Sequence, residues 1–305
     1  MNTVLLFYKY IFIEHPKSIM KWQKKICQDL GFTGRILISH EGINGTIGGA
    51  KENAERYKQI MLDHELFEGI DFKESNGGVE CFPRLSVKVR DEAVSLGIPY
   101  TELTPENRGL HLKPSQAHEL ISQNPDNLVI LDARNDYEWE IGRFENAITP
   151  PIQNFRELPT YIDNNIDLFR DKQVLMYCTG GIRCERASAY LNEKKVAKTV
   201  YQIEGGIHRY AEQYPDGFFR GKNYVFDGRI SLKVNNDILG SCSSCSVPCD
   251  DYYNCLNASC NKHFISCELC ITTLSKTCSR ACKALLDNNT VASRPEFNKV
   301  QSLNT

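Results

Sequence analysis

The segment 174–190 constrains the fold more than any other stretch, because it combines an apolar strand, a tight loop and the start of a helix. The apolar run 174–177 leads into Cys178, two glycines follow, and a helical pattern begins after Arg183. Where such a loop meets a helix N-terminus, backbone N–H groups converge and the helix dipole adds positive charge. A thiol held there loses its proton more easily than a free cysteine, whose pKa is about 8.5. The pattern predicts a nucleophilic Cys178 at the C-terminal end of a strand.

The length of the loop indicates which group it holds. Phosphatase loops of the Cys-x5-Arg type need seven residues for a phosphate, whereas six residues run from Cys178 to Arg183 and Cys184 is the seventh. The shorter loop suits a sulfur atom on the cysteine, and we expect Arg183 to bind phosphate or to stabilise charge on a persulfide or an adduct. Cys184 is expected either to resolve a disulfide or persulfide with Cys178 or to be an ordinary packed thiol. The expected site residues are Cys178 and Arg183 as catalytic groups, with Thr179, Gly180, Gly181 and Ile182 between them.

This loop resembles that of the rhodanese family, and segments on both sides extend the resemblance. Upstream, 129–134, Glu138 and 142–147 are similar to that family's strand, its Asp-x-Arg motif and the following glycine region, in which its histidine is replaced here. Downstream, 200–207 is similar to its last strand and glycine turn. The resemblance implies sulfur transfer through a persulfide on Cys178.

The central region predicts a parallel α/β domain over 113–240, because short apolar runs alternate with helical patterns. Strands are expected at 128–131, 173–176 and 199–202. Sites in such sheets form at the C-terminal ends of the strands, where Cys178 lies. Asp132 and Arg134 follow another strand end, and we expect them to pair within the domain or, alternatively, to touch substrate.

The first ninety-five residues predict a different architecture. Their pattern follows the order β-α-β-β-α-β, which is typical of a ferredoxin-like sandwich over 1–95. The polar hairpin tip 40–45 either forms a glycine turn or directs its side chains at a ligand. Proline, glycine and polar residues then predict a linker over 96–112.

Composition excludes several classes of protein. The chain of 305 residues is 41% hydrophobic, which supports packed cores rather than disorder. The apolar run 1–13 lacks a basic lead and a cleavage site, so it indicates a strand rather than a signal peptide. No apolar run reaches the eighteen residues that a membrane span needs. Thirteen cysteines without an export signal indicate reduced thiols in the cytoplasm, used for metal binding or catalysis.

Nine of the cysteines lie between 242 and 282, where two Cys-x2-Cys pairs have closely spaced partners. Such thiolates are typical ligands of tetrahedral zinc, and metal would supply the folding free energy of a segment with little apolar core. We expect two zinc ions in a domain over 241–286, Cys249 as the spare thiol, and a flexible tail over 287–305. The expected ligands are Cys242, Cys245, Cys255, Cys260, Cys267, Cys270, Cys278 and Cys282.

A net charge of −2 argues against bulk binding of nucleic acid, but the charges are distributed unevenly along the chain. Residues 101–176 contain 7 basic and 13 acidic side chains, whereas 177–233 contain 10 basic and 6 acidic ones. The basic half either steers a polyanion or is an ordinary solvated helix face. The candidate nucleic-acid contacts are Arg186, Lys194, Lys195, Arg220 and Lys222.

The order of these three regions resembles the bacterial tRNA uridine hydroxylase family over nearly the whole chain. The resemblance rests on 90–97, on 178–185, and on the motifs at 253–255 and 260–263 in the cysteine-rich region. It implies oxygen-dependent 5-hydroxylation of the wobble uridine in tRNA, with Cys178 essential. It also implies O2 as co-substrate, the tRNA anticodon arm as partner, and a reductant that the sequence does not identify.

The residues themselves support a narrower statement. No 2-His-1-carboxylate cluster, flavin fingerprint or haem motif is visible, so no organic cofactor is identified. A thiolate that adds to C6 of uracil makes C5 electron-rich, and the splayed bases of an anticodon arm are accessible to such a group. The alternative function is a sulfurtransferase that carries a Cys178 persulfide to a protein or tRNA. A non-catalytic zinc scaffold is disfavoured because the cysteine, both glycines and Arg183 are present.

Overall fold

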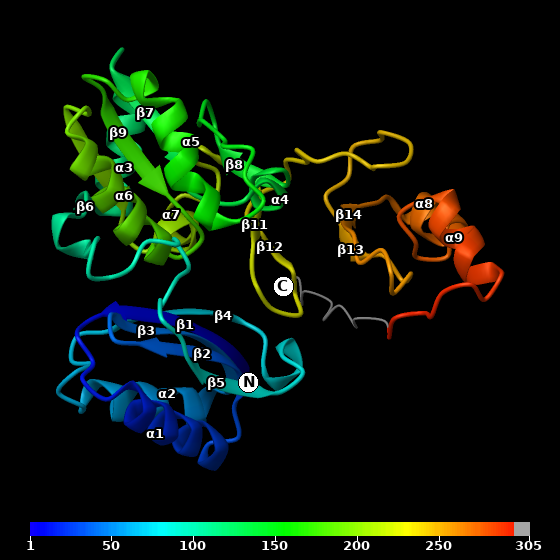
Figure 1. Cartoon of the computed structure of the whole chain (residues 1–305), viewed down its shortest axis with the longest axis horizontal. Helices are drawn as coiled ribbons and strands as arrows, with labels where there is room; N and C mark the ends of the chain where they lie inside the picture. The colour runs from blue at the N-terminus through cyan, green and yellow to red at the C-terminus, as the bar shows by residue number, and fades with distance from the viewer. Residues whose placement is uncertain (296–305) are drawn as a thin grey trace.

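The computed structural model describes residues 1–295, and its N-terminal part is a sheet covered on one face by two helices (Figure 1). The elements are β1 (Asn2–Tyr10), α1 (Pro16–Asp29), β2 (Thr33–Ser39), β3 (Gly42–Ala50), α2 (Lys51–Leu62), β4 (Asp71–Asn76) and β5 (Leu85–Val89). The strand order β4-β1-β3-β2 with antiparallel neighbours confirms the ferredoxin-like sandwich. The fifth strand, β5, pairs with β2 in parallel and forms an edge.

The two faces of the N-terminal sheet have different roles, and β1 shows why. Leu5 and Phe7 are fully buried in the core under the helices. Leu6 and Tyr8, which alternate with them, point to the opposite face because successive side chains of a strand alternate. That opposite face lies toward the central domain, so the two domains pack across it (Figure 1).

The central domain is built on a four-stranded parallel sheet of order β6-β10-β9-β7, which confirms the predicted parallel α/β fold. A smaller sheet of order β12-β11-β8 lies beside it. The elements of the central domain are β6 (Leu110–Leu112), α3 (Pro114–Gln123), β7 (Leu128–Asp132), α4 (Asp136–Trp139), β8 (Gly142–Phe144), α5 (Leu158–Asn164), β9 (Gln173–Tyr177), α6 (Ile182–Lys194), β10 (Thr199–Ile203), α7 (Gly206–Gln213), β11 (Phe219–Tyr224) and β12 (Ser231–Lys233).

Helices cover both faces of the parallel sheet, so its strands are buried on both sides. Val174 and Met176 of β9 belong to the same core cluster as residues of α5 and α6. Leu175 and Tyr177, which alternate with them, pack in the cluster that holds α3 and α7. The strand then ends at Cys178, on the edge of the sheet where the loops converge.

The segment predicted as a linker, 96–112, is part of the central domain. Its last residues form β6, which pairs in parallel with β10. Leu96 and Leu103 are buried in the core against β9 and α6. Proline and glycine content predicted a linker here because composition does not show that two leucines anchor an irregular segment.

The cysteine-rich region contains little secondary structure, and its Tyr252 and Ile265 pack against Ile141 and Tyr224 of the central domain. It holds β13 (Tyr252–Asn254), β14 (His263–Ile265), α8 (Glu268–Thr273) and α9 (Arg280–Asp287). Part of the predicted tail 287–305 folds back, because Ala258 and Arg294 make backbone hydrogen bonds between the segments 256–258 and 292–294. The rest of that prediction, 296–305, lies outside the described residues. Within 1–295 no helix combines the length and the apolar character that crossing a bilayer requires.

Candidate active site and metal centres

Cys178 follows β9 directly, and the loop into α6 surrounds its sulfur. The backbone N–H of Gly181 donates to Cys178 Sγ at 3.2 Å. Gly181 is the N-cap of α6 and has φ of +105°, a conformation that favours glycine. A Cβ at this residue would also lie 2.6 Å from the Tyr8 hydroxyl. The glycine therefore allows both the closure of the loop and the close approach of the N-terminal domain.

The surroundings of Cys178 stabilise a thiolate. The side chain is fully buried, and burial alone raises the pKa of a thiol because it disfavours the charged form. The Cys184 thiol, the Arg183 guanidinium and the N–H groups of Cys184 and Gly181 outweigh that effect. They lower the pKa of Cys178 to about 5, so at neutral pH its sulfur is an anion and a nucleophile.

Cys184 lies in the first turn of α6 and is fully buried. Burial and the neighbouring Cys178 thiolate raise the pKa of Cys184 well above its usual value, so it stays protonated. Its S–H donates to the Cys178 sulfur. The proximity fits a resolving thiol and the burial fits a packed one, and in both cases this hydrogen bond stabilises the anion.

Arg183 is paired inside the protein. Its Nη1 and Nη2 donate to the two carboxylate oxygens of Glu138 at 2.6 and 2.7 Å, and Nη2 also donates to Thr179 Oγ1 at 3.2 Å. The guanidinium lies 5.6 Å from the centre of the Phe226 ring. With this bidentate pair in place, Arg183 is a buried cation that lowers the pKa of Cys178 and not a free phosphate receptor. The sequence motif included Glu138 but did not show that it would reach Arg183.

Asp132 and Arg134 form a fully buried ion pair with an Oδ2–Nη2 distance of 2.6 Å. Arg134 also donates to the carbonyl of Gly142, so it fixes the loop after β7. This confirms the first of the two alternatives for these residues, a charged pair within the domain.

A cavity of about 750 Å³ lies between the N-terminal sheet and the cysteine loop. The loop contributes Cys178, Thr179, Gly180, Ile182 and Arg183, and the sheet contributes Leu6, Tyr8, Arg35, Leu37, Asn44 and Thr46. This volume is within the range of small-molecule sites and accommodates a nucleobase with its sugar. Because both domains supply its walls, the cavity forms only when they pack together.

The polar hairpin between β2 and β3 forms a glycine turn, and the strand that follows contributes side chains to the cavity wall. Gly42, with φ of +147°, forms part of the tight turn, whereas Asn44 and Thr46 line the cavity. Asn44 Nδ2 donates to the carbonyl of Ala93 at 3.0 Å, which fixes the direction of its amide. The sequence motifs did not point to Tyr8, although the alternation of β1 offered a signal, since it places this tyrosine on the face opposite the apolar core.

Tyr8 joins the two domains at the cavity wall. Its hydroxyl donates to Glu185 Oε1 at 3.0 Å, and His111 and Arg108 contact the same carboxylate at 3.0 and 3.1 Å. Burial, followed by the charges of Glu185 and Cys178, raises the pKa of Tyr8 well above its usual value. The hydroxyl therefore keeps its proton at neutral pH beside the Cys178 anion.

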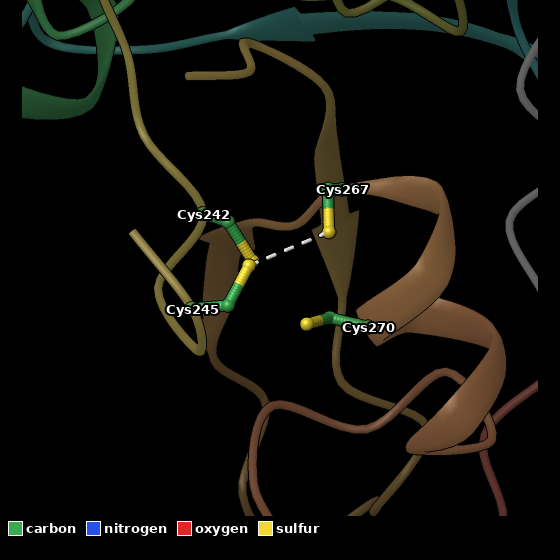
Figure 2. Close-up of side chains that lie close together, drawn as sticks. All are labelled: Cys242, Cys245, Cys267 and Cys270. Carbon is green, nitrogen blue, oxygen red and sulfur yellow. Dashed lines mark hydrogen bonds between the residues drawn. The ribbon is translucent and has the colours of Figure 1, made fainter. Parts of the chain in front are cut away.

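Eight cysteines of the C-terminal region form two clusters, each with four sulfur atoms within 4.8 Å of one another. The first cluster is Cys242, Cys245, Cys267 and Cys270, and the second is Cys255, Cys260, Cys278 and Cys282. Figure 2 shows the four sulfurs of the first cluster pointing to a common centre, with two from the loop before β13 and two from the start of α8. The clusters are interleaved along the chain, and Cys249 lies outside both, as expected.

The spacing of the sulfurs fits tetrahedral zinc. Zinc–sulfur bonds of about 2.3 Å place neighbouring sulfurs of a tetrahedron roughly 3.8 Å apart. The Sγ–Sγ distance is 3.7 Å for Cys245 and Cys267 and 3.6 Å for Cys260 and Cys278. Four thiolates are also the donor set that structural zinc prefers. Both clusters can therefore hold a metal ion of this kind.

Comparison with known proteins agrees with the arrangement of domains. Three family profiles match in order: the UPF0176 acylphosphatase like domain over 2–93, the rhodanese-like domain over 113–213 and the rhodanase C-terminal domain over 220–283. The tRNA uridine(34) hydroxylase of Corynebacterium urealyticum is 42% identical over 285 residues, which cover 91% of this chain and 96% of that protein. This chain belongs to the tRNA uridine(34) hydroxylase family.

Other members of the tRNA uridine(34) hydroxylase family match over a similar length. Those of Corynebacterium jeikeium and Chlamydia abortus are 41% and 39% identical, each over 92% of this chain. The matches cover 93% and 87% of their own lengths. The resemblance inferred from the sequence motifs is thereby confirmed.

The prediction that Arg186 of this tRNA uridine(34) hydroxylase family member contacts nucleic acid is wrong. Arg186 is fully buried and donates to Glu41 Oε2 at 2.6 Å and to the carbonyl of Ile98. It joins the N-terminal hairpin to α6 and is not accessible to RNA. Its place near the cysteine loop in the sequence did not reveal that a carboxylate of the other domain pairs with it.

Three of the other candidate contacts of this hydroxylase-family chain are held by acidic partners, and the fourth is exposed. The pairs are Lys194 with Asp163, Arg220 with Glu145 and Lys222 with Asp250. Lys195 is exposed at the C-terminal end of α6. Four of the five candidate cations are therefore paired within the protein, and Lys195 alone of the five forms no ion pair among the described residues.

Proposed function

We propose that this chain hydroxylates C5 of uridine 34, the wobble uridine of tRNA, with O2 as co-substrate and in the cytoplasm. Membership of the family supports the substrate and the reaction. One observation supports the chemistry most directly: Cys178, with a pKa of about 5, lines a cavity that accommodates a nucleobase. Uridine 34 lies in an anticodon loop, where a base can leave its stack and enter such a cavity.

In the proposed mechanism the Cys178 sulfur adds to C6 of the uracil. An S–C6 bond forms, and the electrons of the C5–C6 double bond move to C5 and O4 as an enolate. C5 then attacks O2, and a reductant supplies two electrons and two protons, so that one oxygen atom remains on C5 as hydroxyl and the other leaves as water. Loss of the C5 proton and cleavage of the S–C6 bond restore the double bond and the thiolate.

The residues around Cys178 have distinct parts in this proposal. Arg183 and the Cys184 thiol keep the sulfur anionic before addition and after release. Arg183 is a positioning residue in this proposal, because Glu138 holds its guanidinium. The Tyr8 hydroxyl donates its proton to Glu185, so in the cavity wall its oxygen is available as an acceptor for the base.

We also propose that zinc is the metal in both cysteine clusters and that it has a structural role. Each cluster already has four thiolates, so no coordination site remains open for a water or a substrate. The ions would stabilise a region that has few buried apolar residues.

The experiment that tests this function is analysis of tRNA nucleosides by mass spectrometry. Cells are compared with the gene deleted, restored, restored as Cys178→Ala, and restored as Cys249→Ser, the matched control outside both metal clusters. We expect 5-hydroxyuridine-type nucleosides to disappear in the deletion and with Cys178→Ala, and to return with the intact gene and with Cys249→Ser.

The alternative, a sulfurtransferase, is supported by the same activated thiolate and by the six-residue loop. It predicts a different result in that experiment, namely unchanged hydroxylated nucleosides together with a decrease in thiolated ones. That result would reject the hydroxylase and favour the transfer of sulfur from a Cys178 persulfide.

A further inference from the structure

We propose that an exposed basic face of the N-terminal sheet binds the sugar-phosphate backbone of the RNA that carries the target uridine. We call it the β2–β5 face and define it by the side chains of Arg35, Arg84, Lys88 and Arg90. The inference rests on the proposed function and locates the RNA contact on a domain where sequence charge did not place it.

The side chains of this face on β5 and on the residues flanking it are identified by alternation. Leu85 and Val87 pack against the core under the helices. Arg84, Lys88 and Arg90 alternate with them, so they point to the opposite side of the sheet. That is the side on which the central domain and the cavity lie (Figure 1).

Arg35 connects this face to the cavity. It lies opposite Thr46 of β3, which in turn lies opposite Leu6 of β1, and all three residues line the cavity. On its other side Arg35 lies opposite Ser86 of β5, between Arg84 and Lys88 in the sequence. The basic face is therefore continuous with the wall of the cavity.

The cations of this face are free to bind an anion. Arg35, Arg84, Lys88 and Arg90 are all exposed, and within residues 1–295 none of them forms an ion pair. Asp91 is exposed beside Arg90 but is not paired with it in that part of the chain. When unpaired arginine and lysine side chains bind phosphates, the counterions condensed on the nucleic acid are released. This release is the main source of affinity for nucleic acids.

The central domain adds one cation at the same place. Arg156 is exposed, lines the cavity and forms no ion pair among the described residues. Exposed side chains that also line a cavity mark where it meets solvent, so Arg35 and Arg156 flank the opening from the two domains. A strand that inserts one base there must carry its phosphates past these groups.

A measurement of RNA binding tests the inference with the full-length protein. The probe is a fluorescently labelled anticodon stem-loop RNA with uridine 34, and Kd is measured by anisotropy over a series of salt concentrations. The test variant is Arg84→Gln/Lys88→Gln, which removes two charges from the face without changing the cavity wall. The matched control is Lys21→Gln/Lys24→Gln, because these exposed lysines lie on α1, on the opposite side of the same sheet.

We expect the face variant to bind about tenfold more weakly at moderate salt, and the slope of log affinity against log salt to decrease by about 1.4 to 1.8, or roughly 0.7–0.9 for each lost contact. The control variant is expected to bind within about twofold of the unchanged protein. The rate of Cys178 alkylation, measured in both variants, reports whether the site is intact and should not change.

Equal affinities of the face variant and the unchanged protein, with equal salt slopes, would overturn the inference. That result would favour an acidic protein as the partner of the β2–β5 face. An equal loss in both variants would also overturn it, since the effect would come from net charge alone. Failure of the proposed function would be a separate result. It would appear as hydroxylated nucleosides that persist in the deletion strain, and it does not depend on the difference in RNA affinity between the face variant and the control variant.

Discussion

Glu41 and Arg186 form an ion pair with an Oε2–Nη1 distance of 2.6 Å, and both side chains are fully buried at the boundary of two domains. Glu41 also accepts the backbone N–H of Ala93. The pair therefore links the N-terminal hairpin, the segment after β5 and the helix that follows the cysteine loop. The cavity at Cys178 depends on how these parts meet.

We predict that Glu41→Gln or Arg186→Met lowers the free energy of unfolding by about 3–5 kcal/mol, because each leaves an uncompensated buried charge or polar group. Urea denaturation measures this. The control is Lys25→Met, which breaks the exposed pair with Asp29 and should cost less than about 1 kcal/mol. Equal effects at the two sites would mean that the buried pair does not hold the domains.

The pH dependence of Cys178 alkylation is the second prediction. The pKa of Cys178 is lowered to about 5, so the reactive anion is present above pH 5 and is lost below it. Labelling with iodoacetamide, followed by mass spectrometry of the peptide, should give a midpoint near pH 5 in the folded protein. In urea the midpoint should move to about 8.5, the value of a free thiol. A folded-state midpoint near 8.5 would contradict the proposed activation.

The same pKa shift has a consequence for stability. Since the folded state binds the Cys178 proton more weakly than the unfolded state does, the anion stabilises the fold fully above the pKa of the free thiol. That contribution is lost as the pH falls from about 8.5 to about 5. As the pH falls over this range, the Tm of the unchanged protein should therefore decrease relative to the Tm of Cys178→Ser. A difference in Tm that stays constant would argue against this stabilisation by the anion.

Replacing Cys184 should change the chemistry of Cys178. A hydrogen bond to a charged group contributes about 1.5–3 kcal/mol, so Cys184→Ala should raise the pKa of Cys178 by roughly 1–2 units. Cys184→Ser keeps a donor in the same place and should have a smaller effect. The alkylation profile measures both variants. Identical profiles for alanine and serine would mean that the donor is not what matters at this residue.

Metal content is the fifth prediction. Elemental analysis of the purified protein should give two zinc ions per chain, one for each cluster. Cys245→Ser and Cys260→Ser should each lose one ion, since they belong to different clusters, and Cys249→Ser should keep both. Two ions lost with a single substitution would show that the clusters fold as one unit.

The sequence by itself determined the local features of this protein. The run from β9 through Gly181 specifies a strand, a turn with positive φ and a helix, because glycine and apolar patterning act over a few residues. The spacing of the nine cysteines predicted eight metal ligands and one spare thiol, because two four-coordinate ions need eight thiolates. The order of such local patterns was also enough to identify the family.

Only the tertiary structure decided which distant groups meet. Arg183 and Arg186 are three residues apart in sequence, yet Glu138 pairs with one and Glu41 of the other domain pairs with the other. A count of charges cannot show which cations have partners, so it favoured the central domain, whereas the unpaired cations beside the cavity lie mostly on β2 and on or next to β5, with Arg156 alone added by the central domain among the described residues. The walls of that cavity, such as Tyr8, are set by the packing of two domains, and this packing depends on long-range contacts that no local pattern encodes.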